Sequence, residues 1–190
     1  YKNMVGAFHH PKLVYMNLHT LETLTDEQFA CGMGEVLKSG LIRDAKFYEW
    51  TINHMAEIQE RIYPVLVKMI QKCCDIKRQV VEEDPNEKGI RAILNLGHTV
   101  GHAVEKLKNF ELLHGQCVAL GTVAAAYLSF KRGYLTNEEF YEIRDMNVGF
   151  DLPIFVDGLE SESVLEATKS DKKMEHGKIK FVLLRSIGHA

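Results

Sequence analysis

The segment Val118–Phe130 constrains the fold of this 190-residue chain more than any other. It is rich in alanine and apolar on nearly every side, which is typical of a helix that lies in the centre of a protein. Such a helix has to be covered by other elements all around, and its small side chains allow those elements to pack closely. The segment therefore predicts a helical core with further helices around it.

Other segments carry the start signals and the apolar spacing of covering helices. Thr25, with Gln28 three residues later, predicts a helix over about Thr25–Ser39 that ends at Gly40. Further helices are predicted from Asp44 through Met55, over Tyr63–Glu83 with Pro64 in the first turn, through the histidine-rich stretch to about Lys108, from Thr136 to near Gly149, and over Ser161–Lys169.

Two short segments are candidates for extended structure. Val14–Asn17 could form a strand or an extended connector, and Lys178–Leu184 contains the branched and aromatic residues that strands favour. We therefore expect a mainly α protein, with residues 1–190 forming a single helical domain that has one or two short strands.

Composition excludes several classes of function. With 23 Lys+Arg against 26 Asp+Glu the net charge is -3, so we expect no general attraction to nucleic acid or to an anionic membrane. No apolar run reaches the roughly 18 to 20 residues of a membrane span, and the N-terminus has no signal pattern. The four cysteines lie in apolar runs without a Cys-x-x-Cys pair, which predicts four reduced core thiols and a cytoplasmic location: Cys31, Cys73, Cys74 and Cys117.

The stretch Arg91–Glu105 contains the most distinctive pattern of polar residues. His98 and His102 are four residues apart, so they share one helix face, and a glycine precedes each of them. This spacing resembles half of a zinc site. A metalloprotease would have Glu directly after the first histidine, and Thr99 is there instead. The pattern thus indicates a metal site more than a peptidase.

Two further residues could complete a metal site. His114 immediately precedes the buried helix, and Glu35 is a lone acid on an otherwise apolar helix face. Catalytic zinc sites take three ligands from separate elements and keep one position open. Each residue also has a plainer interpretation, since His114 could be a core histidine and Glu35 could pair with Lys38 one turn later.

Basic residues form a second theme in the sequence. They are Lys38, Lys77, Arg91 and the pair Lys172 and Lys173, each beside one of the segments named above. If they converge, they would hold a phosphate or a carboxylate, with arginine bidentate and lysines acting as point charges. Taken singly, each is expected on a solvated helix face.

Three of these segments closely resemble the 3-dehydroquinate synthase family: Gly32–Gly40, Arg91–Glu105 and His114–Gly121. Lys2–Phe8 and Asp171–Lys173 fit as well, so the similarity covers essentially the whole chain. Gln116 stands where the family commonly has Glu. What matches is the C-terminal, helical half of the enzyme, and no Gly-x-Gly-x-x-Gly motif follows a strand in this sequence. The resemblance therefore implies that a nucleotide-binding half is missing here.

The resemblance also assigns roles to residues. It implies a zinc ion, or another divalent metal such as Co²⁺, held by Glu35, His98 and His114, with NAD as cofactor of the complete enzyme. His102, which spacing alone had paired with His98 as a ligand, is implied to face the substrate instead. The implied substrate contacts are Asn3, Lys38, Lys77, Arg91, Asn95, His102 and one of Lys172 and Lys173, and His102, Lys38 and Asn95 are the implied catalytic residues.

The resemblance implies the conversion of 3-deoxy-D-arabino-heptulosonate 7-phosphate, a phosphorylated sugar acid, into 3-dehydroquinate and phosphate in the shikimate pathway. We expect no turnover by this chain alone and a homodimer at full length. Two alternatives stay open: another sugar phosphate cyclase of the deoxy-scyllo-inosose or valiolone synthase type, and a helical metal- or anion-binding module without catalysis.

Overall fold

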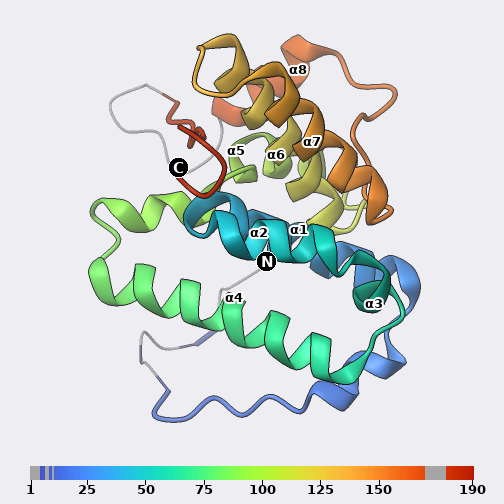
Figure 1. The fold of residues 1–190 in the computed structure, drawn as a ribbon. Coiled ribbons are helices and arrows are strands. Elements are labelled where there is room, and N and C mark those ends of the chain that lie inside the picture. Colours follow the sequence, from blue (N-terminus) through green and yellow to red (C-terminus); the bar gives the residue numbers. More distant parts are fainter. Residues whose placement is uncertain (1–4, 7–8, 10, 170–178) are drawn as a thin grey trace.

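The computed structural model describes residues 5–6, 9, 11–169 and 179–190, and over these residues the chain is helical without a strand. The mainly α fold is therefore confirmed (Figure 1). The helices are the 3₁₀ helices η1 (Leu18–Thr23) and η2 (Ile90–Asn95) and the α-helices α1 (Asp26–Arg43), α2 (Ala45–Asn53), α3 (Met55–Gln59), α4 (Tyr63–Glu83), α5 (His98–Leu107), α6 (His114–Lys131), α7 (Asn137–Gly149) and α8 (Ser161–Lys169).

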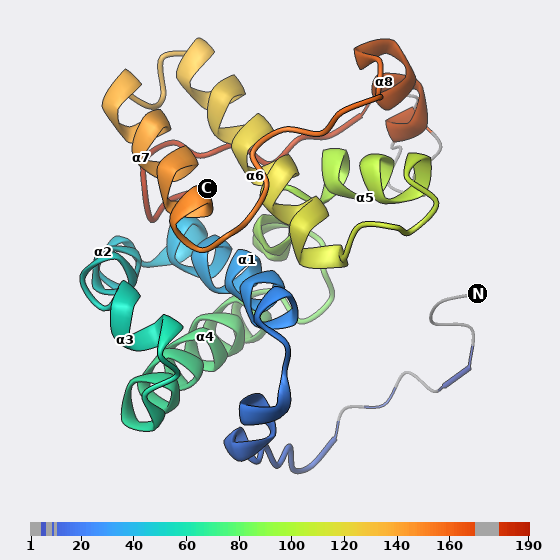
Figure 2. The ribbon, with the colours of Figure 1, turned by 90° about the vertical axis from the view of Figure 1, so that its right-hand side faces the viewer.

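Helices α1 and α6 lie at the centre of the structure. Helix α1 packs against α2, α4 and α6, while α6 also packs against α5 and α7 (Figures 1 and 2). Helix α8 covers the outer side of α5. Helix α6 is buried along most of its length, as its all-round apolar sequence predicts. It lies between α1 on one side and α5 and α7 on the others. The start of α6 therefore lies close to both α1 and α5.

The starts of the helices follow their local sequence signals. The Thr25 hydroxyl accepts a hydrogen bond from the Gln28 amide, and Thr136 does the same for Glu139, each in a reciprocal capping box. Asp44 Oδ1 accepts from the Phe47 amide at 2.9 Å. These caps satisfy backbone donors that have no partner within the helix. The predicted starts of these three helices are therefore confirmed.

Two helix ends differ from the prediction. Helix α1 continues through Gly40 to Arg43, because Gly40 is a packing residue: a Cβ there would lie 2.9 Å from Cβ of Tyr48 in α2. The helix that starts after Asp44 ends at Asn53, and α3 follows as a separate short helix. The predicted long helix α4 has the expected bounds.

The predicted C-terminal strand is wrong in its described part, 179–184. Among the described residues no strand lies beside this segment, and α6 holds its end, since the Leu184 amide donates to Ser129 Oγ at 3.0 Å. Further on, the Gly188 amide donates to the Leu41 carbonyl of α1, and Ser186 and His189 form an isolated bridge. Val14–Asn17 forms no strand either.

The cysteine prediction is correct only in part. All four cysteines are free thiols, but only Cys117 is buried, whereas Cys31 and Cys73 are half-buried and Cys74 is exposed. Cys74 lies on the solvent side of α4, which the apolar neighbours in sequence did not indicate. Within the described part of the chain, no helix is both long and apolar enough to cross a membrane.

Helices α5 and α6 approach each other closely enough to exclude side chains at two glycines. Gly97, just before α5, has φ +77°, and a Cβ there would lie 2.6 Å from Thr122 Oγ1. A Cβ on Gly121 of α6 would lie 1.8 Å from the Gly97 carbonyl oxygen. The left-handed conformation suits glycine, and both contacts leave no room for a methyl group.

We predict that Gly121→Ala lowers the free energy of unfolding by about 3 kcal/mol or more, because the methyl group forces two backbones apart. Gly32→Ala is the matched control, since Gly32 lies within α1 and its Cβ would meet nothing within 4 Å. The control should gain about 0.5–1 kcal/mol from helix propensity. Urea unfolding of both variants measures the difference, and equal stability of the two would contradict the close packing.

Candidate functional site

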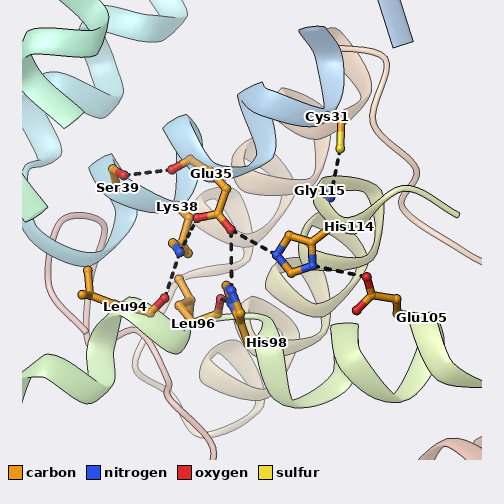
Figure 3. Close-up of polar contacts among 10 residues, drawn as sticks. All are labelled: Cys31, Glu35, Lys38, Ser39, Leu94, Leu96, His98, Glu105, His114 and Gly115. Carbon is orange, nitrogen blue, oxygen red and sulfur yellow. Dashed lines mark hydrogen bonds and ion pairs between the residues drawn. The ribbon is translucent and has the colours of Figure 1, made fainter. Parts of the chain in front are cut away.

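Glu35, His98 and His114 come from three different helices and meet at one point (Figure 3). Glu35 is on α1, His98 is the first residue of α5, and His114 is the first residue of α6. Glu35 Oε1 lies 3.6 Å from Nε2 of His98 and 3.7 Å from Nε2 of His114. One carboxylate oxygen and two imidazole nitrogens thus face each other.

A close contact between α1 and α6 brings His114 to Glu35. The Gly115 amide donates to Cys31 Sγ at 3.0 Å, and a Cβ on Gly115 would lie 2.0 Å from the Cys31 carbonyl oxygen. A Cβ on Gly34 would in turn lie 2.8 Å from the Gly115 carbonyl. Because Gly34 precedes Glu35 and Gly115 follows His114, the two glycines allow the backbones to bring these side chains together.

The position of His98 depends on a break in the chain. The predicted single helix through Arg91, Asn95 and His98 is wrong, because η2 ends at Asn95 and α5 begins at His98 after Gly97 in the left-handed conformation. The break turns the carbonyl of Leu96 toward His98 Nδ1, which lies 3.1 Å away. A carbonyl only accepts hydrogen bonds, so the neutral ring carries its proton on Nδ1. Its Nε2 then has a free lone pair on the side of Glu35.

The His98 ring is held neutral by its surroundings. Burial, followed by the nearby charge of Lys38, lowers the pKa of His98 from 6.5 to about 4. The deprotonated ring is the form that binds a metal.

Lys38 and the two histidines contact different oxygens of the Glu35 carboxylate. The buried ammonium pairs with Oε2 and also donates to the Leu94 carbonyl at 2.8 Å, while Oε1 faces the two histidines. The plainer interpretation of Glu35 as an ion-pair partner of Lys38 is therefore correct for one of its oxygens. Burial opposes ionisation of Glu35, but Lys38 and the histidines outweigh it and lower the pKa of the carboxyl group.

The donor set fits a divalent metal. Glu35, His98 and His114 each offer one ligand atom, and these atoms lie within 4.8 Å of one another. One carboxylate with two histidines is an established type of catalytic zinc site. In the described part of the chain, His102, Glu105 and His114 form a second group whose ligand atoms lie equally close together, and it shares His114 with the first.

A cleft of about 520 Å³ adjoins these ligand candidates. Its wall includes Glu35, Lys38, Lys77 and His98, so the structure brings two of the predicted basic residues to the predicted metal ligands. Sequence reasoning missed Ser39, Cys73 and Cys74, which also line the cleft. Burial is the main cause that raises the pKa of Cys73 to about 12, so this thiol stays protonated.

Of the remaining predicted site residues, some lie near the ligand candidates and others do not. The His102 ring lies 5.2 Å from the His98 ring and 5.9 Å from the His114 ring. Asn95 is the last residue of η2, next to the break before His98. Arg91 is not in the wall of the cleft, and its guanidinium donates to the Pro85 carbonyl at 3.1 Å. Asn3, Lys172 and Lys173 lie outside the described residues.

Gln116, which differs from the residue common in the resembled family, has a structural role here. Its Oε1 accepts from the Leu113 amide at 2.8 Å, and its Nε2 donates to Glu27 of α1 at 3.2 Å. It therefore caps the start of α6 and links that start to α1.

Residues 32–174 match the family model described as 3-dehydroquinate synthase C-terminal. The chain is 42% identical over 190 residues to 3-dehydroquinate synthase of Nitrosospira multiformis, covering all of this chain and 52% of the relative. It is 39% identical over 188 residues to the enzyme of the same name from Syntrophotalea carbinolica, covering 98% of this chain and 52% of the relative. The chain thus spans about half the length of the curated relatives that it matches.

Two solved structures share the fold. One is 2-epi-5-epi-valiolone synthase from Streptomyces hygroscopicus subsp. jinggangensis 5008 with NAD⁺ and Zn²⁺ bound, with TM-score 0.89, 24% identity, and coverage of 98% of this chain and 52% of that one. The other is 2-deoxy-scyllo-inosose synthase complexed with carbaglucose-6-phosphate, NAD⁺ and Co²⁺, with TM-score 0.84, 24% identity and coverage of 98% and 53%. At this identity the likeness concerns the fold alone.

We predict that His98 of the metal-free chain stays neutral down to about pH 5 and takes up a proton near pH 4. Because an unfolded histidine is protonated below about 6.5, stability contributed by the neutral ring is fully present above that pH and is lost as the pH falls toward 4. NMR titration of the ring measures this. Lys38→Met should raise the pKa of His98 by removing a neighbouring positive charge, and a His98 pKa near 6.5 in the unmodified chain would contradict the environment described here.

Proposed function

The chain belongs to the 3-dehydroquinate synthase C-terminal family, and we propose that it is the metal- and substrate-binding part of a 3-dehydroquinate synthase. The observation that carries the proposal is the meeting of Glu35, His98 and His114 beside a cleft that contains Lys38 and Lys77. The reaction is the conversion of 3-deoxy-D-arabino-heptulosonate 7-phosphate into 3-dehydroquinate and phosphate. Its place is the shikimate pathway in the cytoplasm.

In this proposal residues 1–190 form one helical domain, and NAD binds to a separate N-terminal domain of a longer, homodimeric protein. The relatives support a longer protein, because the chain spans about half of their length. The N-terminal domain would hold NAD, which would supply hydride-transfer chemistry at a ring carbon of the substrate.

Glu35, His98 and His114 would hold a divalent metal, with zinc as the proposed ion and cobalt as a substitute. The neutral His98 ring and the lone pair at its Nε2 suit this role, as does the free Oε1 of Glu35. The ion, when bound, acts as a Lewis acid on a substrate hydroxyl or carbonyl oxygen. The cleft, which Glu35 and His98 line, would give the substrate access to an ion held there.

Basic residues would bind the two anionic groups of the substrate. Lys38 and Lys77 act as point charges within the cleft, and Arg91 offers a planar pair of donors that matches a carboxylate or a phosphate. Since Arg91 now donates to Pro85, substrate binding would exchange that contact for the anion. Asn3, Asn95 and one of Lys172 and Lys173 complete the proposed set of contacts.

His102 would serve the substrate and not the metal. Its ring lies beside the rings of His98 and His114, so it would be within reach of a substrate group bound next to them. There it would transfer a proton or hold the phosphate. Lys38 and Asn95 are the other proposed catalytic residues, and they stabilise developing charge and orient the substrate.

The relatives favour this substrate over those of other cyclases. Relatives named 3-dehydroquinate synthase are 39–42% identical to the chain, whereas the two cyclases with solved structures are 24% identical and show the fold alone. The experiments below also test the two alternatives, a cyclase reaction on another phosphorylated sugar and a metal-binding module without catalysis.

The metal site predicts which histidines matter for metal binding. The chain should retain one Zn²⁺ or Co²⁺ per molecule after dialysis, and Glu35→Gln, His98→Ala and His114→Ala should each lose most of it. His102→Ala should keep the metal, as should the control His19→Ala, whose side chain is 63% exposed beside Glu22. Elemental analysis measures the content. Equal retention in all five variants would refute the proposed ligand set.

The proposed reaction predicts activity only with an NAD-binding half. The 190-residue chain, given NAD and 3-deoxy-D-arabino-heptulosonate 7-phosphate, should release no phosphate. Fused behind the N-terminal half of the Nitrosospira multiformis enzyme, it should form 3-dehydroquinate and phosphate in equal amounts, and His102→Ala should abolish this while keeping the metal.

The unmodified Nitrosospira multiformis enzyme is the control for that experiment. A different carbocyclic product from the fusion would point to another cyclase. Bound metal without turnover would support the non-catalytic module, and phosphate release by the chain alone would refute the need for a second half.

A further inference from the structure

Glu105 lies on the opposite side of His114 from Glu35 and has no role in the reaction proposed above (Figure 3). Its Oε1 is 3.5 Å from His114 Nδ1, while His114 Nε2 faces Glu35. The Glu105 side chain is only 14% exposed. Carboxylates are rarely buried to this extent unless they have a partner, so the pairing with His114 needs an explanation.

The His114 ring itself shows why a partner is needed. Although the side chain is partly exposed, its Nδ1 is cut off from solvent and has no hydrogen-bond partner among the described residues. A buried polar atom in a native protein normally has a partner. The distance of 3.5 Å to Glu105 is slightly longer than a hydrogen bond. Contacts of this length at sites without a bound ligand often tighten only when the ligand binds.

His98 provides the pattern for comparison. Its Nδ1 faces an oxygen acceptor, the Leu96 carbonyl, and its Nε2 faces Glu35 Oε1. His114 repeats this arrangement with Glu105 in place of the carbonyl. In both rings an oxygen faces Nδ1 and Glu35 faces Nε2.

We propose that Glu105 is a positioning residue for His114, accepting its Nδ1–H and thereby fixing the tautomer and ring orientation in which Nε2 binds the metal. Outer carboxylates of this kind commonly orient metal-binding histidines and increase their basicity. The inference rests on the proposed metal site, but its first test does not require a metal.

The competing interpretation makes Glu105 a ligand itself. His102, Glu105 and His114 also have donor atoms within 4.8 Å of one another. A metal on that side would bind Nδ1 of His114, so the proton would sit on Nε2. The two interpretations therefore predict opposite tautomers of the same ring.

The first experiment determines the tautomer in the metal-free chain. With ¹⁵N-labelled histidine at about pH 8, where an ordinary imidazole is neutral, His114 should carry its proton on Nδ1. Glu105→Ala should shift the proton toward Nε2, and Glu105→Gln should preserve the Nδ1 form because its amide oxygen still accepts. Glu111→Ala is the matched control, since it removes an exposed acid three residues before His114 and should change nothing.

The second experiment measures Zn²⁺ affinity against a competing chelator. Glu105→Ala should weaken binding about 10–100-fold at an unchanged stoichiometry of one, Glu105→Gln should weaken it less, and Glu111→Ala should leave it unchanged. With Co²⁺ bound, the visible spectrum of Glu105→Gln should match that of the unmodified chain, because the ligand set is the same.

Two results would overturn the proposal. One is an Nε2 proton on His114 in the unmodified chain, or a tautomer that does not respond to Glu105→Ala. The other is loss of the metal in both Glu105 variants and in His102→Ala while Glu35→Gln keeps it, which would make Glu105 a ligand. If the chain binds no metal at all, the proposed metal site fails, and the tautomer measurement alone decides the role of Glu105.

Discussion

The approach of α6 to its two neighbours at backbone distance is the constraint on which the site depends. The start of α6 touches α1 where Gly115 meets Cys31, and six residues further along α6 touches the start of α5 where Gly121 meets Gly97. Side chains at these glycines would push the helices apart. Since the three ligand candidates come from these three helices, their separation of less than 5 Å requires both contacts.

Electrostatics then determines what the assembled side chains can bind. Three potential cations, Lys38 and two histidines, surround the single carboxylate of Glu35. Burial and Lys38 keep His98 neutral, so Lys38 is the charge that balances Glu35 and the His98 ring remains available as a metal ligand. Because the ammonium occupies only Oε2, it orients the carboxylate and still leaves Oε1 for a metal. Lys38 thus orients the Glu35 carboxylate and also helps to keep the His98 ring neutral.

The sequence predicted those parts of the structure that depend on local signals. Thr25, Asp44 and Thr136 begin helices because their caps involve neighbours three residues away, and α6 is central because its composition suits only a buried helix. The failures lie where a distant residue decides. Gly40 ends no helix because Tyr48 packs on it, and the segment 179–184 forms no strand because its hydrogen bonds are made with Thr99 of α5 and Ser129 of α6.

The same distinction explains the site. Spacing identified the histidines as notable, and the resemblance separated His98 from His102, but neither indicated that η2 and α5 are separate helices. Glu105 was within the most distinctive stretch and still received no role, because its partner His114 belongs to another helix. A simple helical spacing relates Glu105 to His102, and only the packing of α5 against α6 relates it to His114. Residues that orient ligands are therefore harder to find from sequence than the ligands, because their function depends on one specific atom of a neighbour.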